Sequence, residues 1–180
     1  MTITNPYASL ADVKAALRIS DSVDDGLIEI AIEAASREID GYCERVFYNA
    51  GTQTKTFLPT DSFLVEIDDL QSLTSLKTDS NGDGSFDVTW SATDLQLEPL
   101  NQFVSGLDTP FTRIRAIGRY LFPIFDVQNA NYFEASVQIV GTWGFSAVPL
   151  AVKQACILSS MRQFKRYDAP LGIAGFGDFG

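Results

Sequence analysis

Residues 22–46 read SVDDGLIEIAIEAASREIDGYCERV, and this stretch decides the helical part of the fold. Apolar side chains return at alternating spacings of four and three residues, the pattern of a helix that packs along one face. Ser22 followed by Asp25 has the spacing of a capping box, so the sequence predicts a helix over residues 23–45. The members of its apolar seam are Ile28, Ile32, Ala35, Ile39, Tyr42 and Val46.

A shorter helix precedes this one and carries its own start signal. Ser9 and Asp12 stand three residues apart, as in a capping box, and Leu10, Val13 and Leu17 then fall on one helical face. A polar break at residues 20–22 separates the two helices. The N-terminal helices are therefore expected within residues 1–46.

Helical periodicity returns near the C-terminus. Pro149 fits the first turn of a helix, where its missing N–H costs nothing, and the cations Lys165 and Arg166 suit the end of the helix dipole. The pattern predicts a helix over residues 146–166. Its apolar positions are Ala151, Val152, Ala155, Cys156, Leu158, Met161 and Phe164.

Between these helices the period changes to that of strands. Residues 47–145 contain short alternating segments separated by turn signals, which indicate an antiparallel β subdomain. Residues 118–131, with Pro, Asn and aromatic side chains, are typical of a loop. The expected strands lie at residues 52–58, 63–67, 73–77, 86–90, 95–98, 112–117 and 135–140.

The order of these parts predicts an α+β fold within one domain over residues 1–180. A small helical core, made by the N-terminal pair and the C-terminal helix, receives the inserted antiparallel β subdomain. Residues 167–180 are expected to form an extended arm, because the last twelve residues contain four glycines, which disfavour a helix.

The arm is too apolar for a solvated tail, so it is expected to become ordered against a partner. Its predicted contact residues are Pro170, Leu171, Ile173, Phe176 and Phe179, and the cations Arg162, Lys165 and Arg166 are assigned to the same interface.

The amino-acid composition limits the kinds of catalytic and metal site that the chain can form. The chain is 46% hydrophobic and 20% charged, as soluble globular proteins are. It has no histidine, which excludes Ser-His-Asp and Cys-His nucleophiles and histidine-ligated zinc. Cys43 and Cys156 lie in helical patterns and are expected to be buried free thiols. No apolar run reaches the roughly 20 residues of a membrane helix, and the N-terminus lacks a signal-peptide pattern, so a cytoplasmic product is expected.

The charge is unevenly spread. Residues 1–110 carry 19 acidic and 6 basic side chains, a balance of −13, whereas residues 111–180 carry 4 acidic and 7 basic ones, a balance of +3. A tight duplex-DNA binder should present a basic patch that displaces counterions, and the acidic portion argues against one. The asymmetry also fits a simple role in solubility.

Residues 79–84, DSNGDG, match the first half of a calcium loop. Oxygens of Asp79, Asn81 and Asp83 could converge on a cation, but Trp90 stands where the bidentate carboxylate is expected. We interpret the loop as a hairpin turn without a functional metal, and weak calcium binding stays as the alternative.

Other charged groups are weaker candidates. The pairs Asp24/Asp25 and Asp68/Asp69 are adjacent in sequence, so their side chains diverge and a catalytic role is disfavoured. Arg113, Arg115 and Arg119 lie near aromatic residues and could contact phosphates. A solvated face, or a partner for another subunit's acidic surface, is the preferred interpretation.

Both ends of the chain resemble the head-tail connector (adaptor) proteins of long-tailed bacteriophages. The N-terminal resemblance runs from YASLADVK at residues 7–14 through AAS at residues 34–36 to YCERVF at residues 42–47. The C-terminal one comprises TWGF at residues 142–145, Val148-Pro149, and FKRYDAPLG at residues 164–172. Tyr167 stands where the family pattern has a further Arg.

The resemblance implies a structural, non-enzymatic virion protein made in the host bacterial cytoplasm and located at the head-tail interface. It implies a homo-oligomeric ring of twelve beneath the portal protein, in contact with tail or tail-completion proteins. DNA would pass through the lumen without specific binding, and no cofactor and no membrane would be involved. The competing hypotheses are a calcium-stabilised or ligand-binding β module, a carboxylate-based hydrolase and a tail-completion protein.

Overall fold

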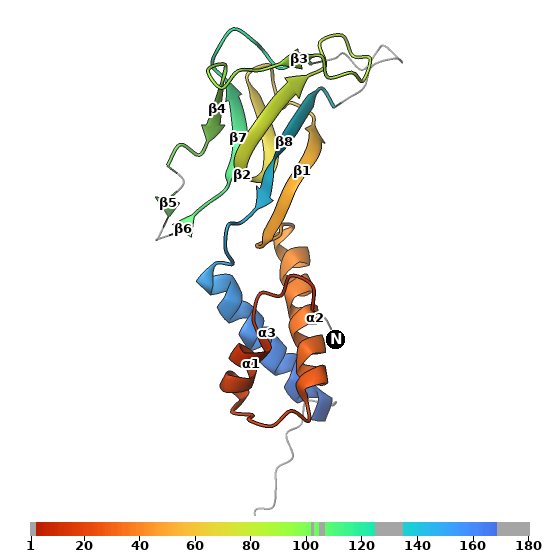
Figure 1. The fold of residues 1–180 in the computed structure, drawn as a ribbon, viewed down its shortest axis with the longest axis vertical. Coiled ribbons are helices and arrows are strands. Elements are labelled where there is room, and N and C mark those ends of the chain that lie inside the picture. Colours follow the sequence, from red (N-terminus) through yellow and green to blue (C-terminus); the bar gives the residue numbers. More distant parts are fainter. Residues whose placement is uncertain (1–2, 102, 105–106, 125–134, 169–180) are drawn as a thin grey trace, which may run out of the picture. The chain divides into compact units, whose positions relative to one another are not determined.

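The computed structural model describes residues 3–101, 103–104, 107–124 and 135–168. Three helices and an antiparallel sheet confirm the predicted α+β class (Figure 1). The elements are α1 (Leu10–Leu17), α2 (Asp25–Cys43), β1 (Asn49–Phe57), β2 (Leu64–Thr78), β3 (Val88–Thr89), β4 (Leu95–Glu98), β5 (Phe103–Val104), β6 (Leu107–Asp108), β7 (Phe111–Ala116), β8 (Val137–Gly144) and α3 (Leu150–Asp168).

The chain divides into two compact units. A helical unit combines residues 1–47 with residues 148–180, and a β unit comprises residues 48–147. The chain therefore leaves the helical unit after α2 and returns to it before α3. None of the helices that the structure describes has the length and apolar composition that a membrane crossing requires.

In the helical unit, α1 begins as the sequence predicts. The Ser9 hydroxyl accepts a hydrogen bond from the Asp12 N–H, and the Asp12 carboxylate accepts one from the Ser9 N–H, so the capping box is complete. For α2 the prediction is wrong: Asp24 is the N-cap, and its side chain makes no capping hydrogen bond. Asp21 forms the turn before α2 by accepting a hydrogen bond from the Val23 N–H.

The core of the helical unit lies between α2, α3 and the segment before α1. Ser36 on α2 lies 3.5 Å from the thiol of Cys156 on α3, and both side chains are buried. Tyr7 is also buried; its hydroxyl accepts a hydrogen bond from the Phe47 N–H and donates one to Asp40. Burial raises the pKa of the Tyr7 hydroxyl, with the Asp40 hydrogen bond as a second cause.

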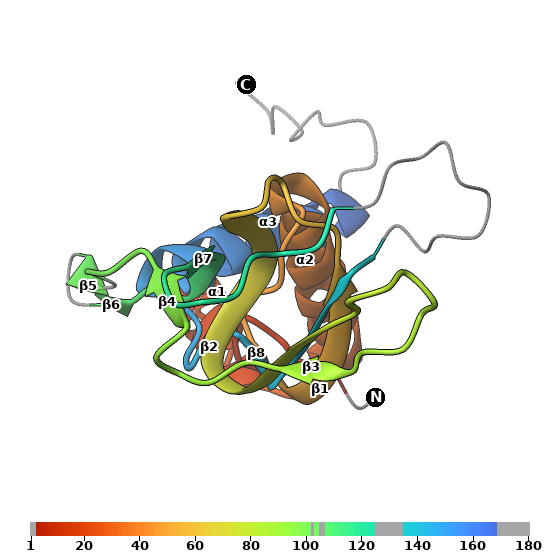
Figure 2. The same cartoon turned by 90° about the horizontal axis from the view of Figure 1, so that it is seen from above.

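In the β unit, the sheet order is β1-β8-β2-β7-β4, and β3 pairs with β2. β2 pairs with β7 through its first half and with β8 through its second half, and Leu70 lies opposite both Phe111 and Trp143. Figure 2 shows β2 curving through the unit, with β7 and β4 on one side and β8 and β1 on the other. The two strands predicted at residues 63–67 and 73–77 are thus one bent strand, whose register shifts mark its bulges.

This curvature encloses an apolar core. Trp143 is buried, and its indole N–H donates to the Gln53 carbonyl at 2.9 Å. Trp90 stacks on Phe122 with ring centroids 4.6 Å apart. The buried apolar residues of this core are Val65, Ile67, Leu70, Leu76, Trp90, Leu95, Ile114, Ala116, Phe122, Val137, Ile139 and Trp143.

Candidate protein-protein interface

The cations predicted to contact a partner lie on the last turns of α3. Arg162, Lys165 and Arg166 are all exposed. Within the described part of the chain, none of them forms an ion pair, in contrast to Lys153, which lies at least nine residues earlier on the same helix. α3 extends to Asp168, two residues past the predicted end, so residues 167 and 168 of the predicted arm belong to the helix. Pro170, Leu171, Ile173, Phe176 and Phe179 lie outside the described residues.

The side of α3 that faces the helical unit is held in place by polar contacts. Lys153 forms a 2.9 Å ion pair with Asp12 of α1. Gln163 donates to Glu38 of α2 at 2.9 Å, and Ser160 is buried. These contacts fix which face of α3 is turned outward.

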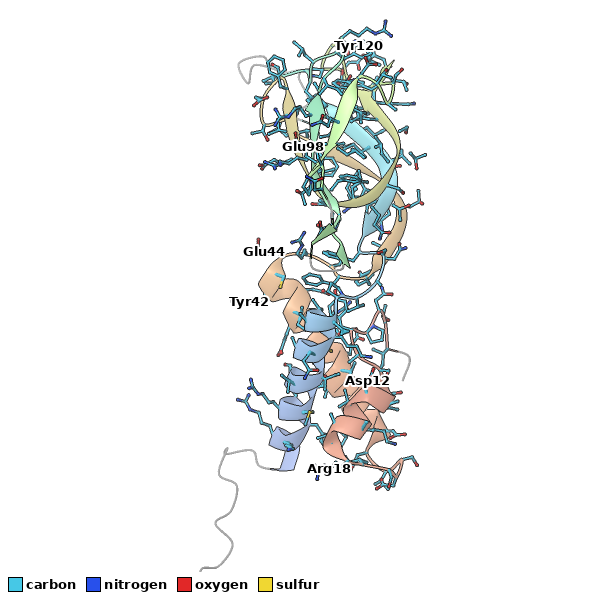
Figure 3. All side chains as sticks on the ribbon, turned by 90° about the vertical axis from the view of Figure 1, so that its left-hand side faces the viewer. Asp12, Arg18, Tyr42, Glu44, Glu98 and Tyr120 are labelled. Carbon is cyan, nitrogen blue, oxygen red and sulfur yellow. The ribbon has the colours of Figure 1, made fainter. Side chains whose placement is uncertain are left out.

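The outward surface of the helical unit is rich in apolar side chains. On α3, Leu150 is 74% exposed and Leu158 is 46% exposed. Val23, in the turn before α2, is 86% exposed, and Tyr42 at the end of α2 is 92% exposed. Figure 3 shows Tyr42 and Glu44 at one end of α2 and Arg18 near the other. Val23 and Tyr42 lie at opposite ends of α2, so they are separate exposed positions and not one continuous patch.

Two expectations about α2 and its end are therefore wrong. Tyr42 was predicted to continue the buried seam, but only the positions from Ile28 to Ala35 are fully buried. Cys43 was expected to be buried and is exposed, whereas Cys156 is buried as predicted. The helix ends at Cys43, and Glu44 adopts a left-handed conformation with φ of 52°. Val46, the last member of the predicted seam, therefore lies beyond the helix.

A second exposed apolar cluster lies in the β unit, around the ends of β1 and β7. The Phe63 carbonyl accepts a hydrogen bond from the Ala116 N–H, and the Ser62 carbonyl accepts one from the Phe122 N–H. These bonds bring the segments before β2 and after β7 together. The exposed members of the cluster are Leu58, Phe63, Ile117, Leu121 and Ile124.

The loop at residues 79–84 owes its shape to Asp79. This carboxylate is fully buried and accepts hydrogen bonds from the N–H groups of Asn81, Gly82 and Gly84. The Asn81 side-chain amide in turn donates to Asp83 at 3.1 Å. In the parts of the chain that the structure describes, no group of three or more Cys, Asp or Glu side chains is placed to hold a metal ion. The loop is therefore organised by its own backbone N–H groups.

The predicted basic cluster has a partner within the chain. Arg113 and Arg115 share one face of β7, as their alternation predicts, and both face Glu98 on β4. The Arg115 Nε lies 2.6 Å from Glu98. This hydrogen bond lowers the pKa of Glu98 and raises that of Arg115. The cluster is therefore partly neutralised, and Arg119 is directed to the face of the Tyr120 ring.

The adjacent carboxylates do not converge. Asp25 forms an ion pair with Lys14, and Asp68 forms one with Lys55 at 2.7 Å. Asp69 is buried while Asp68 is exposed, as expected for neighbours on a strand. Their arrangement provides no pair of acids facing one substrate atom.

The exposed face of α3 was missed by the sequence reasoning, although a signal was present. At about 100° per residue the apolar residues of α3 are spread around the whole helix and cannot all share one buried face; they include positions 150, 151, 152, 155, 156, 158, 161 and 164. Cys156 points inward, and Ala155 and Leu158 point outward. α3 therefore has an exposed apolar face beside its buried one.

In the residues that the structure describes, the fold is that of an α+β protein with three helices, a six-stranded antiparallel sheet and the two-stranded β5–β6 sheet, and both units expose apolar side chains. Residues 7–77 match the family model of the phage gp6-like head-tail connector protein. The resemblance of the N-terminal part to head-tail connector proteins is therefore confirmed.

A solved structure is also similar over the whole chain. It is described as "Neck of empty GTA particle computed with C6 symmetry". The TM-score is 0.58 at 17% sequence identity, and the alignment covers 100% of this chain and 85% of that chain. At this identity the likeness demonstrates a shared fold. No curated protein sequence matches the chain.

Proposed function

We propose that the chain is a structural subunit of the neck of a tailed phage or phage-like particle, where it forms a ring that joins the portal of the DNA-filled head to the tail. The match of residues 7–77 to head-tail connector proteins carries this proposal. Its likeness to a neck structure computed with C6 symmetry supports it, and a ring of twelve is compatible with sixfold symmetry. The exposed apolar side chains of both units supply surface for neighbouring subunits.

The charge supports a passive role toward DNA. The β unit carries 12 acidic and 5 basic side chains over its 100 residues, a balance of −7. Arg113 and Arg115 are already engaged by Glu98. An acidic lumen repels phosphates, so DNA would pass without being held. Such a subunit acts through contacts with itself, the portal and tail proteins, and it needs neither catalysis nor a cofactor.

Particle assembly without the chain tests this function. Cells that produce the particles with the gene deleted should accumulate DNA-filled heads and separate tails, and supplying the gene in trans should restore joined particles. Gold labelling of a tagged chain should mark the neck. Joined, infectious particles without the chain would contradict the proposal. Label on isolated tails, with none on heads, would instead identify a tail-completion protein.

A further inference from the structure

The outward face of α3 has the spacing of a helix-packing surface. Ala151, Ala155, Leu158, Arg162 and Lys165 follow one another at intervals of four, three, four and three residues, and each is exposed. We call these five residues the α3 stripe. Two alanines allow close approach of another backbone, and Leu158 supplies an apolar contact at the centre.

The stripe changes character along its length. Its first three members are apolar, and its last two are cations with no ion-pair partner among the described residues. The carboxylate on α1 that pairs with α3, Asp12, contacts Lys153, which lies on another face of the helix. The stripe therefore matches a partner that offers one apolar side chain beside carboxylates.

The turn between α1 and α2 offers that combination. Val23 is 86% exposed and lies between the carboxylates of Asp21 and Asp24. The Lys14 ammonium pairs with Asp25 and reaches only the backbone carbonyl of Asp21. We call residues 21–24 the acidic turn. Apolar and negative groups here complement the apolar and positive groups of the α3 stripe.

The two surfaces lie at the same level of the helical unit. The acidic turn and the C-terminal end of α3 are both at the lower end of this unit in Figure 1. In Figure 3, α3 lies along one edge of the unit, and α1 with the following turn lies along the other. Two different patches at one level and on different edges suit a head-to-tail contact that closes into a ring.

We propose that the α3 stripe binds the acidic turn of a second copy of this chain, with Leu158 against Val23 and with Arg162 and Lys165 near Asp21 and Asp24. This inference rests on the proposed ring and assigns the subunit contact within it. It places the contact on the helical unit of each subunit.

Charge reversal in the full chain tests the assignment by sedimentation velocity over a range of concentrations and salt. Arg162→Glu with Lys165→Glu should raise the concentration needed for half-assembly at least about tenfold. Asp21→Lys with Asp24→Lys should do the same, and the four changes together should restore assembly. The control pair, Arg45→Glu with Arg119→Glu, changes net charge equally at exposed positions outside both surfaces. Equal losses in the control pair, or no recovery in the fourfold variant, would overturn the assignment.

Cross-linking inside particles tests this subunit contact independently of the proposed function. In a Cys43→Ser background, Leu158→Cys combined with Val23→Cys should give a ladder of multimers with a bis-maleimide, because Cys156 is buried. Each single cysteine should give at most a dimer. Particles that contain the chain in their necks but give no ladder would refute the contact and leave the function standing. A chain missing from necks would remove the function itself.

Discussion

The Lys153 ammonium lies 2.9 Å from the Asp12 carboxylate, and this ion pair joins α3 to α1. Asp12 also completes the capping box at the start of α1. One side chain thus links α1 to the last described helix, α3, which bears one surface of the proposed subunit contact; the other surface, the acidic turn, follows α1.

The stability of the helical unit should depend on pH through the Asp12 carboxyl group. The hydrogen bond from Ser9, followed by that from Lys153, lowers the pKa of Asp12 from 3.8 to about 2. Because the folded-state pKa is depressed, the stabilisation is fully present above pH 3.8 and is lost as the pH falls toward 2. Asp12→Asn should destabilise the unit by about 1 kcal/mol at neutral pH and by less near pH 2.

Urea unfolding followed by helical circular dichroism measures this difference at both pH values. Glu44→Gln, at an exposed position past the end of α2, serves as the control and should change stability little at either pH. An equal deficit for Asp12→Asn at both pH values would show that the carboxylate charge contributes nothing.

Trp90 should be a principal support of the β unit. It is buried, stacks on Phe122, and donates its indole N–H to the Thr78 hydroxyl at 3.0 Å. Trp90→Ala should destabilise the unit by about 3–5 kcal/mol, because it removes a large apolar side chain and leaves a cavity. Trp90→Phe keeps the ring contact and loses the hydrogen bond, so its loss should be about 1–2 kcal/mol.

Thermal unfolding followed by far-ultraviolet circular dichroism measures these losses. Leu100, which is 68% exposed, provides the comparison: Leu100→Ala should stay within about 0.5 kcal/mol of the wild type. A Trp90→Ala variant as stable as Leu100→Ala would contradict the assigned role.

How far the sequence predicts this structure depends on how local the signal is. The capping box at Ser9 is local, and it forms as predicted because both partners lie within one turn. The signature at Ser22 is equally clear in sequence, yet Asp21 already shapes that turn and the helix begins at Asp25. Competing carboxylates in one short segment made the helix start ambiguous.

The features that the sequence does not predict depend on pairing between strands that are far apart in the sequence. Strand β2 continues through Asp68 and Asp69, which are poor strand residues, because β7 and β8 pair with its two halves on either side of the bend. The β5–β6 hairpin was not predicted, since each strand has only two residues. The sequence does not show which residue pairs with Arg113 and Arg115, because Glu98 lies next to them only when β4 pairs with β7.

The Asp79 loop should depend on its carboxylate and not on calcium. Asp79→Ala would leave three backbone N–H groups without their acceptor in a buried position, which should destabilise the β unit by about 2–4 kcal/mol. Asp83→Ala removes the acceptor of exposed hydrogen bonds from the Asn81 amide and the Ser85 N–H, so its effect should be smaller than that of Asp79→Ala. Calcium titration should leave the melting temperature of the wild type unchanged. A rise that Asp83→Ala abolishes would instead reveal a calcium site, since a bound ligand stabilises the folded state by mass action.

Alanine substitutions at two glycines of the β1–β8 pair can distinguish the cost of a steric clash from the cost of a left-handed backbone. Gly144 has φ of +85°, and a Cβ there would lie 2.0 Å from the Tyr48 carbonyl oxygen. Gly51 has φ of +75° but has open space around it. Gly51→Ala should therefore cost about 1 kcal/mol, the penalty of a left-handed backbone for an L side chain.

Gly144→Ala should cost about 3 kcal/mol or more, because it adds a backbone clash to the same conformational penalty. Matched unfolding curves of the two variants measure the difference directly, since both residues lie on the same pair of strands. Equal losses would mean that β1 moves away from β8 without cost. The hydrogen bond from the Phe145 N–H to the Tyr48 carbonyl makes that movement unfavourable, because it fixes the oxygen that the new Cβ would meet.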